Sequence, residues 1–175
     1  MTTSPCAIPR TYAQWSVVLD RFRDGDDSVL EAMAQGTVEW SPGVAERWTR
    51  QVYDALDARL KSLSQALQLG LGRAAGDATA IGQAMLSARR SLARLRAFAE
   101  TPCIPPQVAG ELAAALQRWA RESQSSLEKS AAAIRNDHGR MLKIVRDQPL
   151  DAHTPSSKAS SPAVPPAPCG RRVIL

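Results

Sequence analysis

Four arginines in the middle of the chain are the residues best suited to bind an anion. Arg89, Arg90, Arg94 and Arg96 fall in a stretch with no acidic residue between positions 77 and 100. At 100° per residue, a helix points Arg90 and Arg94 away from its apolar stripe and leaves Arg89 and Arg96 at the border. Guanidinium groups on one face can hold a phosphate backbone by charge alone. A solvated face neutralised by acidic groups is the simpler interpretation, because no nucleic-acid-binding motif accompanies these arginines.

The last seven residues form a second candidate site, which we expect to bind a partner. The sequence Cys-Gly-Arg-Arg-Val-Ile-Leu places two cations before three apolar residues and a carboxylate. Such a peptide can add as a strand to a partner's sheet edge or seat its last side chains in a pocket. Weak contact with an anionic membrane and an end with no role are the alternatives. The candidate partner-binding residues are Arg171, Arg172, Val173, Ile174 and Leu175.

The sequence offers little for enzyme chemistry, and we expect no catalytic residue and no cofactor. Gly70, Gly72 and Gly76 have the spacing GxGxxxG after a predicted helix, whereas a dinucleotide-binding turn needs GxGxxG after a strand. Cys103 and His138 could pair in principle, but nothing local orients a nucleophile beside a base. The glycines therefore indicate an interhelical loop, and the histidine indicates a surface turn.

Carboxylates cluster near the predicted end of the first helix. Asp20, Asp24, Asp26 and Asp27 could attract a hard cation, but they lack the spacing of an EF-hand loop. Helix capping and compensation of the helix dipole explain Asp26 and Asp27 without a metal. The three cysteines are too far apart in sequence for a CxxC site or a disulfide framework. We therefore expect no bound metal.

The elements that must position these residues are predicted to be helices, and the predicted fold class is all-α. Apolar residues recur at helical spacing, with breaks at glycines and prolines. Aromatic residues make up only 5% of the chain, and β-branched residues are scarce, which favours helix over sheet. No segment alternates polar and apolar residues over strand length, so no strand is predicted within the domain and residues 37–40 are a link. The predicted helices cover residues 11–24, about 28–35, 42–69, 77–100 and 106 into the 130s, followed by a short helix that ends before residue 149.

Local signals support several of these boundaries. Ser41 is a candidate N-cap, with Pro42 at the favoured first helical position. Ser28 and Glu31 have the spacing of a capping box, and Asp77 is a candidate cap for the fourth helix. The apolar seam of that helix has coiled-coil-like spacing and consists of Ile81, Met85, Ala88, Leu92, Leu95 and Ala99.

Three long helices with short connections pack best as an antiparallel bundle. We predict a bundle of about five to six helices over residues 11–148, after an irregular N-terminus at residues 1–10. Residues 149–168 are rich in Pro, Ser and Ala and lack the apolar content to fold, so we expect a disordered linker that leads to the docking peptide at residues 169–175. Long helices and a narrow seam favour a homo-oligomer, with a dimer preferred.

Composition and charge narrow the class of protein. The net charge is +5, but residues 1–42 carry three basic and six acidic side chains, which suits self-association or an acidic partner better than dedicated nucleic-acid binding. The sequence has no run of 18 apolar residues that would predict a membrane span. The cysteine usage and the lack of a signal peptide indicate a cytoplasmic protein.

The sequence therefore predicts a non-enzymatic cytoplasmic adaptor, scaffold or chaperone-like protein. It would self-associate through its bundle and recruit a larger protein partner through the C-terminal peptide. In layout it is similar to small helical adaptors and chaperones of bacterial assemblies, and that likeness transfers no residue roles. The alternative is a nucleic-acid-associated protein that uses the helix carrying Arg89–Arg96.

Overall fold

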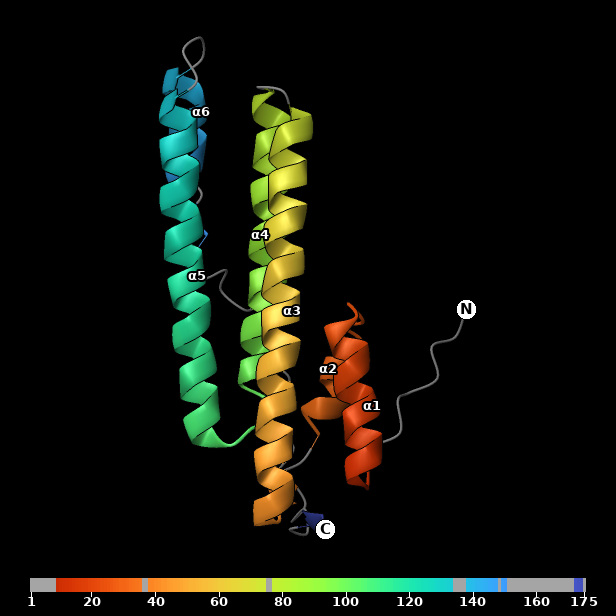
Figure 1. Cartoon of the computed structure of the whole chain (residues 1–175). Helices are drawn as coiled ribbons and strands as arrows, with labels where there is room; N and C mark the ends of the chain where they lie inside the picture. The colour runs from red at the N-terminus through yellow and green to blue at the C-terminus, as the bar shows by residue number, and fades with distance from the viewer. Residues whose placement is uncertain are drawn as a thin grey trace, which may run out of the picture. The chain divides into compact units, whose positions relative to one another are not determined.

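The computed structural model describes residues 9–35, 38–74, 77–133, 138–147, 149–150 and 172–174. These residues form helices and two three-residue strands, which confirms the all-α class (Figure 1). The elements in chain order are α1 (Tyr12–Arg23), α2 (Val29–Met33), β1 (Val38–Trp40), α3 (Pro42–Ala74), α4 (Ala78–Ala99), α5 (Pro106–Ala133), α6 (His138–Asp147) and β2 (Arg172–Ile174).

Side chains near the chain turns explain how the first helices begin and end. Thr11 and Gln14 form a reciprocal capping box at the start of α1. Gly25 follows α1 with a φ of 108°, a conformation that favours glycine. The predicted capping box of Ser28 is wrong, because its side chain makes no cap hydrogen bond. The Asp26 carboxylate accepts the Ser28 backbone N–H at 3.0 Å and so forms a turn just before the helix.

Helix α3 does not end where the glycines predicted. It begins at Pro42 as expected but continues through Gly70 and Gly72 to Ala74, so the predicted interhelical loop at residues 70–76 is wrong for residues 70–74. A Cβ atom on Gly70 would lie 3.1 Å from the Cβ atom of Ala84. Gly70 therefore serves the close approach of α3 and α4 rather than a break.

The chain divides into two compact units, and the first comprises residues 1–59, 97–112 and 156–175. Its described core combines α1, α2 and the adjoining parts of α3, α4 and α5, and Figure 1 shows α1 and α2 beside α3. Gln51 of α3 accepts hydrogen bonds from two hydroxyl groups of α1, Tyr12 at 3.0 Å and Ser16 at 2.8 Å. The largest fully buried side chains of this unit are Trp15, Phe22, Met33, Trp48 and Phe98.

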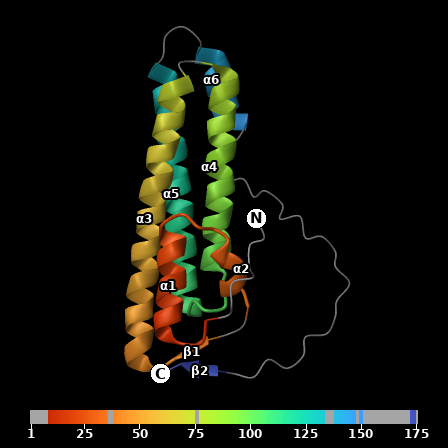
Figure 2. The same cartoon turned by 90° about the vertical axis from the view of Figure 1, so that its right-hand side faces the viewer.

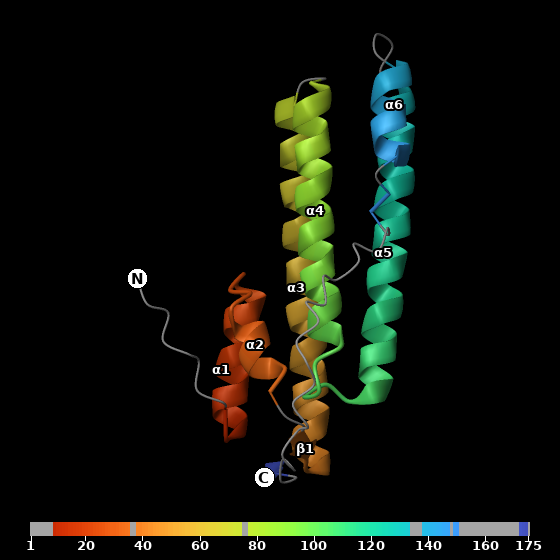
Figure 3. The ribbon, with the colours of Figure 1, turned by 180° about the vertical axis from the view of Figure 1, so that it is seen from behind.

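The second unit comprises residues 60–96 and 113–155. Within it, α3 and α4 run in opposite directions, and Figure 3 shows α6 lying along α5. The predicted seam of α4 is buried in the structure, and Leu92 in this unit is fully enclosed. The side-chain amide of Gln124 in α5 donates to the Val145 carbonyl at 2.9 Å and accepts the Leu150 N–H at 3.3 Å. Leu150 is buried.

The two strands pair with each other in a parallel two-stranded sheet (Figure 2). The prediction that residues 37–40 only link helices is therefore wrong for residues 38–40. A three-residue strand is too short for an alternating pattern to be recognised, which is why no strand was predicted there. Among the described residues, no helix is long and apolar enough to cross a membrane. The predicted irregular N-terminus, apart from its last two residues, and the linker beyond residue 150 lie outside the described residues.

Candidate peptide-docking site

The C-terminal tip lies as a strand beside β1. The Cα partners are Val38 with Arg172, Glu39 with Val173 and Trp40 with Ile174. Strand pairing works through backbone N–H and C=O groups, which every residue except proline supplies. Residues 172–174 belong to the predicted partner-binding residues, whereas Arg171 and Leu175 lie outside the described part of the chain.

The side chain of Trp40 fixes β1 to the first unit. Its indole N–H donates to the Cys103 carbonyl at 3.2 Å, and the Trp48 indole N–H donates to the same oxygen at 3.0 Å. The two indole rings stack with centroids 4.8 Å apart and planes inclined by 28°. Trp15 packs edge-on against both rings, at 6.2 Å from Trp40 and 5.9 Å from Trp48. β1 is therefore attached to a buried aromatic cluster rather than carried on a loose loop.

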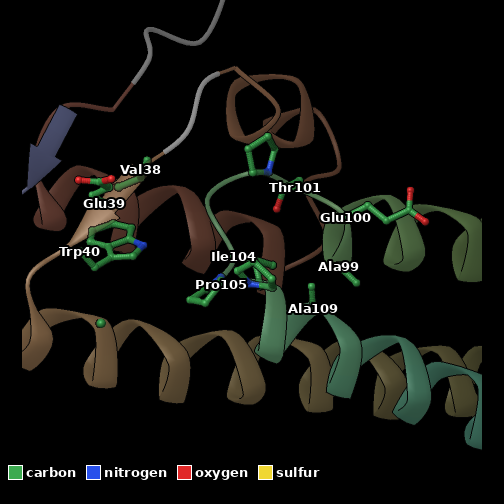
Figure 4. A pocket seen from close by; sticks show the side chains of 12 residues that line it. Val38, Glu39, Trp40, Ala99, Glu100, Thr101, Ile104, Pro105 and Ala109 are labelled. Atoms are coloured by element: carbon green, nitrogen blue, oxygen red, sulfur yellow. The ribbon is translucent and has the colours of Figure 1, made fainter. Parts of the chain in front are cut away.

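A cleft of about 800 Å³ opens beside β1. Figure 4 shows Trp40 on one side of it and Ile104 and Pro105, from the segment between α4 and α5, on the other. Two acidic residues, Glu39 and Glu100, also line it. Its walls are mainly apolar, and they comprise Val38, Glu39, Trp40, Ala45, Ala99, Glu100, Thr101, Pro102, Ile104, Pro105, Pro106 and Ala109.

Glu39 and Arg172 carry opposite charges, but their positions lie on opposite faces of the strand pair. Glu39 is half-buried and has an interaction partner in the structure. Arg172 is the Cα partner of Val38, one position before Glu39, and successive residues of a strand alternate between the two faces. The register therefore supports pairing through backbone groups rather than through a charge pair between these two residues.

The segment between α4 and α5, which lines the cleft, has a structural role rather than a reactive one. The Cys103 side chain is buried, and this burial raises the pKa of its thiol to about 11. A neutral thiol is a poor nucleophile. The Thr101 hydroxyl donates to the Phe98 carbonyl at 2.7 Å and lies 3.4 Å from the Cys103 sulfur. These contacts stabilise the turn after α4 and present the Cys103 carbonyl to the two indoles.

The acidic cluster at the end of α1 is engaged in ion pairs within the chain. Asp26 lies 2.5 Å from Arg21, and Asp27 lies 2.5 Å from Arg59. Hydrogen bonds from Ser28 and Arg21 lower the pKa of Asp26. The part of the chain that the structure describes contains no group of three or more His, Cys, Asp or Glu residues that could hold a metal ion.

The candidate anion-binding arginines lie on α4 as the helical spacing predicted. Arg90 and Arg94 are exposed, while Arg89 and Arg96 are half-buried. The Nε atom of Arg89 is buried and has no hydrogen-bond partner among the described residues.

Comparison with protein-family models, with curated proteins and with solved structures found no match. The function must therefore be argued from the chain's own residues. Reasoning from the sequence missed β1 and the cleft. The only local signal was Val38 and Trp40, two residue types with high strand propensity, on either side of Glu39.

Proposed function

We propose that this chain is a non-enzymatic helical adaptor, or chaperone-like interaction protein, that recruits a larger protein partner through its C-terminal tip. The tip would add as a strand to the edge of a sheet in that partner. The observation that carries the proposal is the parallel pairing of residues 172–174 with β1. A segment that pairs with a strand of its own chain has the extended backbone that pairing with another protein requires.

The chemistry of the tip supports this mode of binding. Val173 and Ile174 are β-branched, and β-branched residues favour extended backbone. Backbone hydrogen bonds supply affinity in strand addition, and alternate side chains supply specificity. Self-association of the bundle and a cytoplasmic location complete the proposed role. Size-exclusion chromatography with light scattering tests the proposed dimer.

The recruiting role is tested with a variant that cannot pair as a strand. Proline has no N–H and is excluded from the interior of a strand ladder. The double variant Val173→Pro/Ile174→Pro therefore removes every pairing N–H at these two positions. The matched control exchanges the two residues, Val173→Ile/Ile174→Val, and keeps the composition and the β-branching. Both variants and the natural chain are used as baits in cell lysate, and the captured proteins are identified by mass spectrometry.

The expected result is a protein captured by the natural chain and by the exchange control but lost from the proline variant. Purified components should then reproduce the same difference in affinity. Capture of the same proteins by all three baits would overturn recruitment by strand addition. Thermal unfolding of each bait verifies that the substitutions leave the helical domain folded.

Exposure of Arg90 and Arg94 on α4 supports a second candidate function, association with nucleic acid. Each phosphate contact adds roughly one to the slope of log K against log salt concentration. The double variant Arg90→Gln/Arg94→Gln should then reduce this slope by about two. An unchanged slope, or no binding by the natural chain at low salt, would overturn this candidate.

A further inference from the structure

We propose that β1 and the cleft beside it form a peptide-binding site whose resident ligand is the chain's own C-terminal strand. The tip is then held in cis, and any partner that binds the tip must first displace it from β1. This latch goes beyond the adaptor role and does not depend on it, because the tip can occupy β1 whether or not it recruits a partner.

The receiving strand is ordered before the ligand arrives. Trp40 stacks on Trp48, and both indoles donate to the single carbonyl of Cys103. These contacts involve no residue of the tip, so β1 keeps its position when the tip leaves. A preordered site avoids part of the entropic cost of binding. A three-residue pairing can therefore have useful affinity.

The register defines the chemical class of the ligand. The strand runs parallel to β1 and places a basic residue opposite Val38 and β-branched residues opposite Glu39 and Trp40. Glu39 is among the residues that line the cleft, but its position and that of Arg172 lie on opposite faces of the strand pair. The site therefore favours an extended peptide with β-branched residues at the positions opposite Glu39 and Trp40. Val173 and Ile174 are such residues.

Covalent attachment makes a weak pairing effective. A tethered ligand typically acts at an effective concentration on the order of 1 mM. If the free peptide binds β1 with a Kd on the order of 0.1 mM, the tip fills the site about nine-tenths of the time. Only the released fraction can bind elsewhere, so the latch weakens capture by a partner about tenfold. This factor is the quantity that the experiments below measure.

Disulfide trapping tests the register and the cis arrangement. The variant Val38→Cys/Arg172→Cys places cysteines at partner positions, whereas Val38→Cys/Val173→Cys shifts one of them by a residue and to the opposite face of the strand. Both are made in full chains that also carry Cys6→Ser and Cys169→Ser. Each is oxidised at several protein concentrations, and cross-linked monomer and dimer are separated by non-reducing electrophoresis.

The expected result is a monomeric cross-link in the partner pair, formed at a rate independent of protein concentration and at least tenfold faster than in the shifted pair. Buried Cys103 stays in place, because its raised pKa keeps the thiol neutral at the pH of the assay. Equal cross-linking of both pairs would overturn the register. Cross-linked dimer alone would overturn the cis arrangement and assign the strand to a second copy.

Peptide competition tests the latch itself. A fluorescent peptide of residues 169–175, with Cys169→Ser, is titrated into the natural chain and into Val173→Pro/Ile174→Pro, whose own tip cannot compete. The apparent Kd should be about tenfold lower for the proline variant. Equal values, or no binding to the variant, would overturn the latch. A failure of partner capture with this competition intact would instead overturn only the adaptor role.

A proline in the receiving strand identifies the site as β1. Glu39→Pro, introduced into the proline variant, should weaken binding of the natural peptide several-fold, because proline is excluded from the interior of a strand ladder. Glu39→Thr, which removes the same carboxylate but keeps the backbone N–H, is the matched control. Equal effects of the two substitutions would overturn the assignment to β1.

Discussion

The shared carbonyl of Cys103 gives a sharp prediction about stability. It accepts one N–H from Trp40 and one from Trp48, at 3.2 Å and 3.0 Å. Trp40→Phe or Trp48→Phe removes one donor and keeps an aromatic ring in the stack. Either single variant leaves the carbonyl with one partner, and only the double variant leaves it with neither of these indole donors.

The energies of the three variants should therefore not add. Losing one of the two hydrogen bonds costs a net of about 0.5–1.5 kcal/mol. The smaller ring of phenylalanine adds a separate cost in packing. Leaving a buried acceptor without a partner costs about 1–3 kcal/mol, and Cys103 is only 1% exposed. The double variant should be less stable than the sum of the single effects by about 1–2 kcal/mol. The cost of the smaller rings occurs in both single variants and largely cancels from this difference.

Urea unfolding followed by circular dichroism at the helix signal measures the four free energies of unfolding. This signal is preferable to tryptophan fluorescence, because the substitutions remove the fluorophores themselves. Additivity within about 0.4 kcal/mol would refute the shared-acceptor reasoning. It would mean that another donor or water satisfies the carbonyl once the indoles are gone.

Three further predictions concern the ion pair, the thiol and the glycines. Asp27→Asn should lower the free energy of unfolding in urea by about 1–3 kcal/mol, because it leaves the guanidinium of Arg59 without its carboxylate partner. The side chain of Arg59 is only 14% exposed. A loss below about 0.3 kcal/mol would contradict this reasoning. The pKa of Cys103 is raised in the fold from 9.0 to about 11. The contribution of the neutral thiol to the free energy of unfolding is therefore complete below pH 9 and is lost as pH rises to 11, by up to about 3 kcal/mol. In unfolding measured as a function of pH, Cys103→Ala should reduce this loss of stability between pH 9 and pH 11. An unchanged loss would mean that other groups cause it. A Cβ atom at Gly72 meets open space, so Gly72→Ala should raise the melting temperature through about 1 kcal/mol of helix propensity. Gly70→Ala should raise the melting temperature less, because its Cβ atom would lie close to Ala84. The reverse order would contradict the close contact between the helices.

The features that the sequence predicted well are those determined within one helical turn. Pro42 begins α3, because its fixed φ suits the first helical position. Asp77 accepts the Thr79 N–H at 2.9 Å just before α4, as its side chain predicted. The buried seam of α4 follows from residue spacing alone, because any helix with that spacing presents one apolar face.

The features that the sequence did not predict depend on residues distant in the chain. Gly70 alone predicts a helix break, and its actual role depends on the close approach of Ala84 in α4. Trp40 and Cys103 are 63 positions apart, and no local pattern indicates that one carbonyl will accept two indoles. The candidate site combines both kinds of feature. The composition of the tip suggested a strand, but its receptor β1 exists only once the aromatic cluster has assembled.

Strand addition to a partner and occupation of β1 use the same backbone groups of the tip. A substitution that only improves strand pairing would strengthen both and leave the competition between them nearly unchanged. A partner must therefore gain its advantage over β1 from contacts that β1 lacks, such as a longer sheet edge or a pocket for Ile174. Weakening β1 alone should instead raise capture of the partner. Glu39→Pro in an otherwise natural chain, which interrupts β1, should thus increase partner affinity by up to tenfold, the factor by which the latch reduces it. A decrease in capture would mean that β1 presents the tip to the partner rather than withholding it.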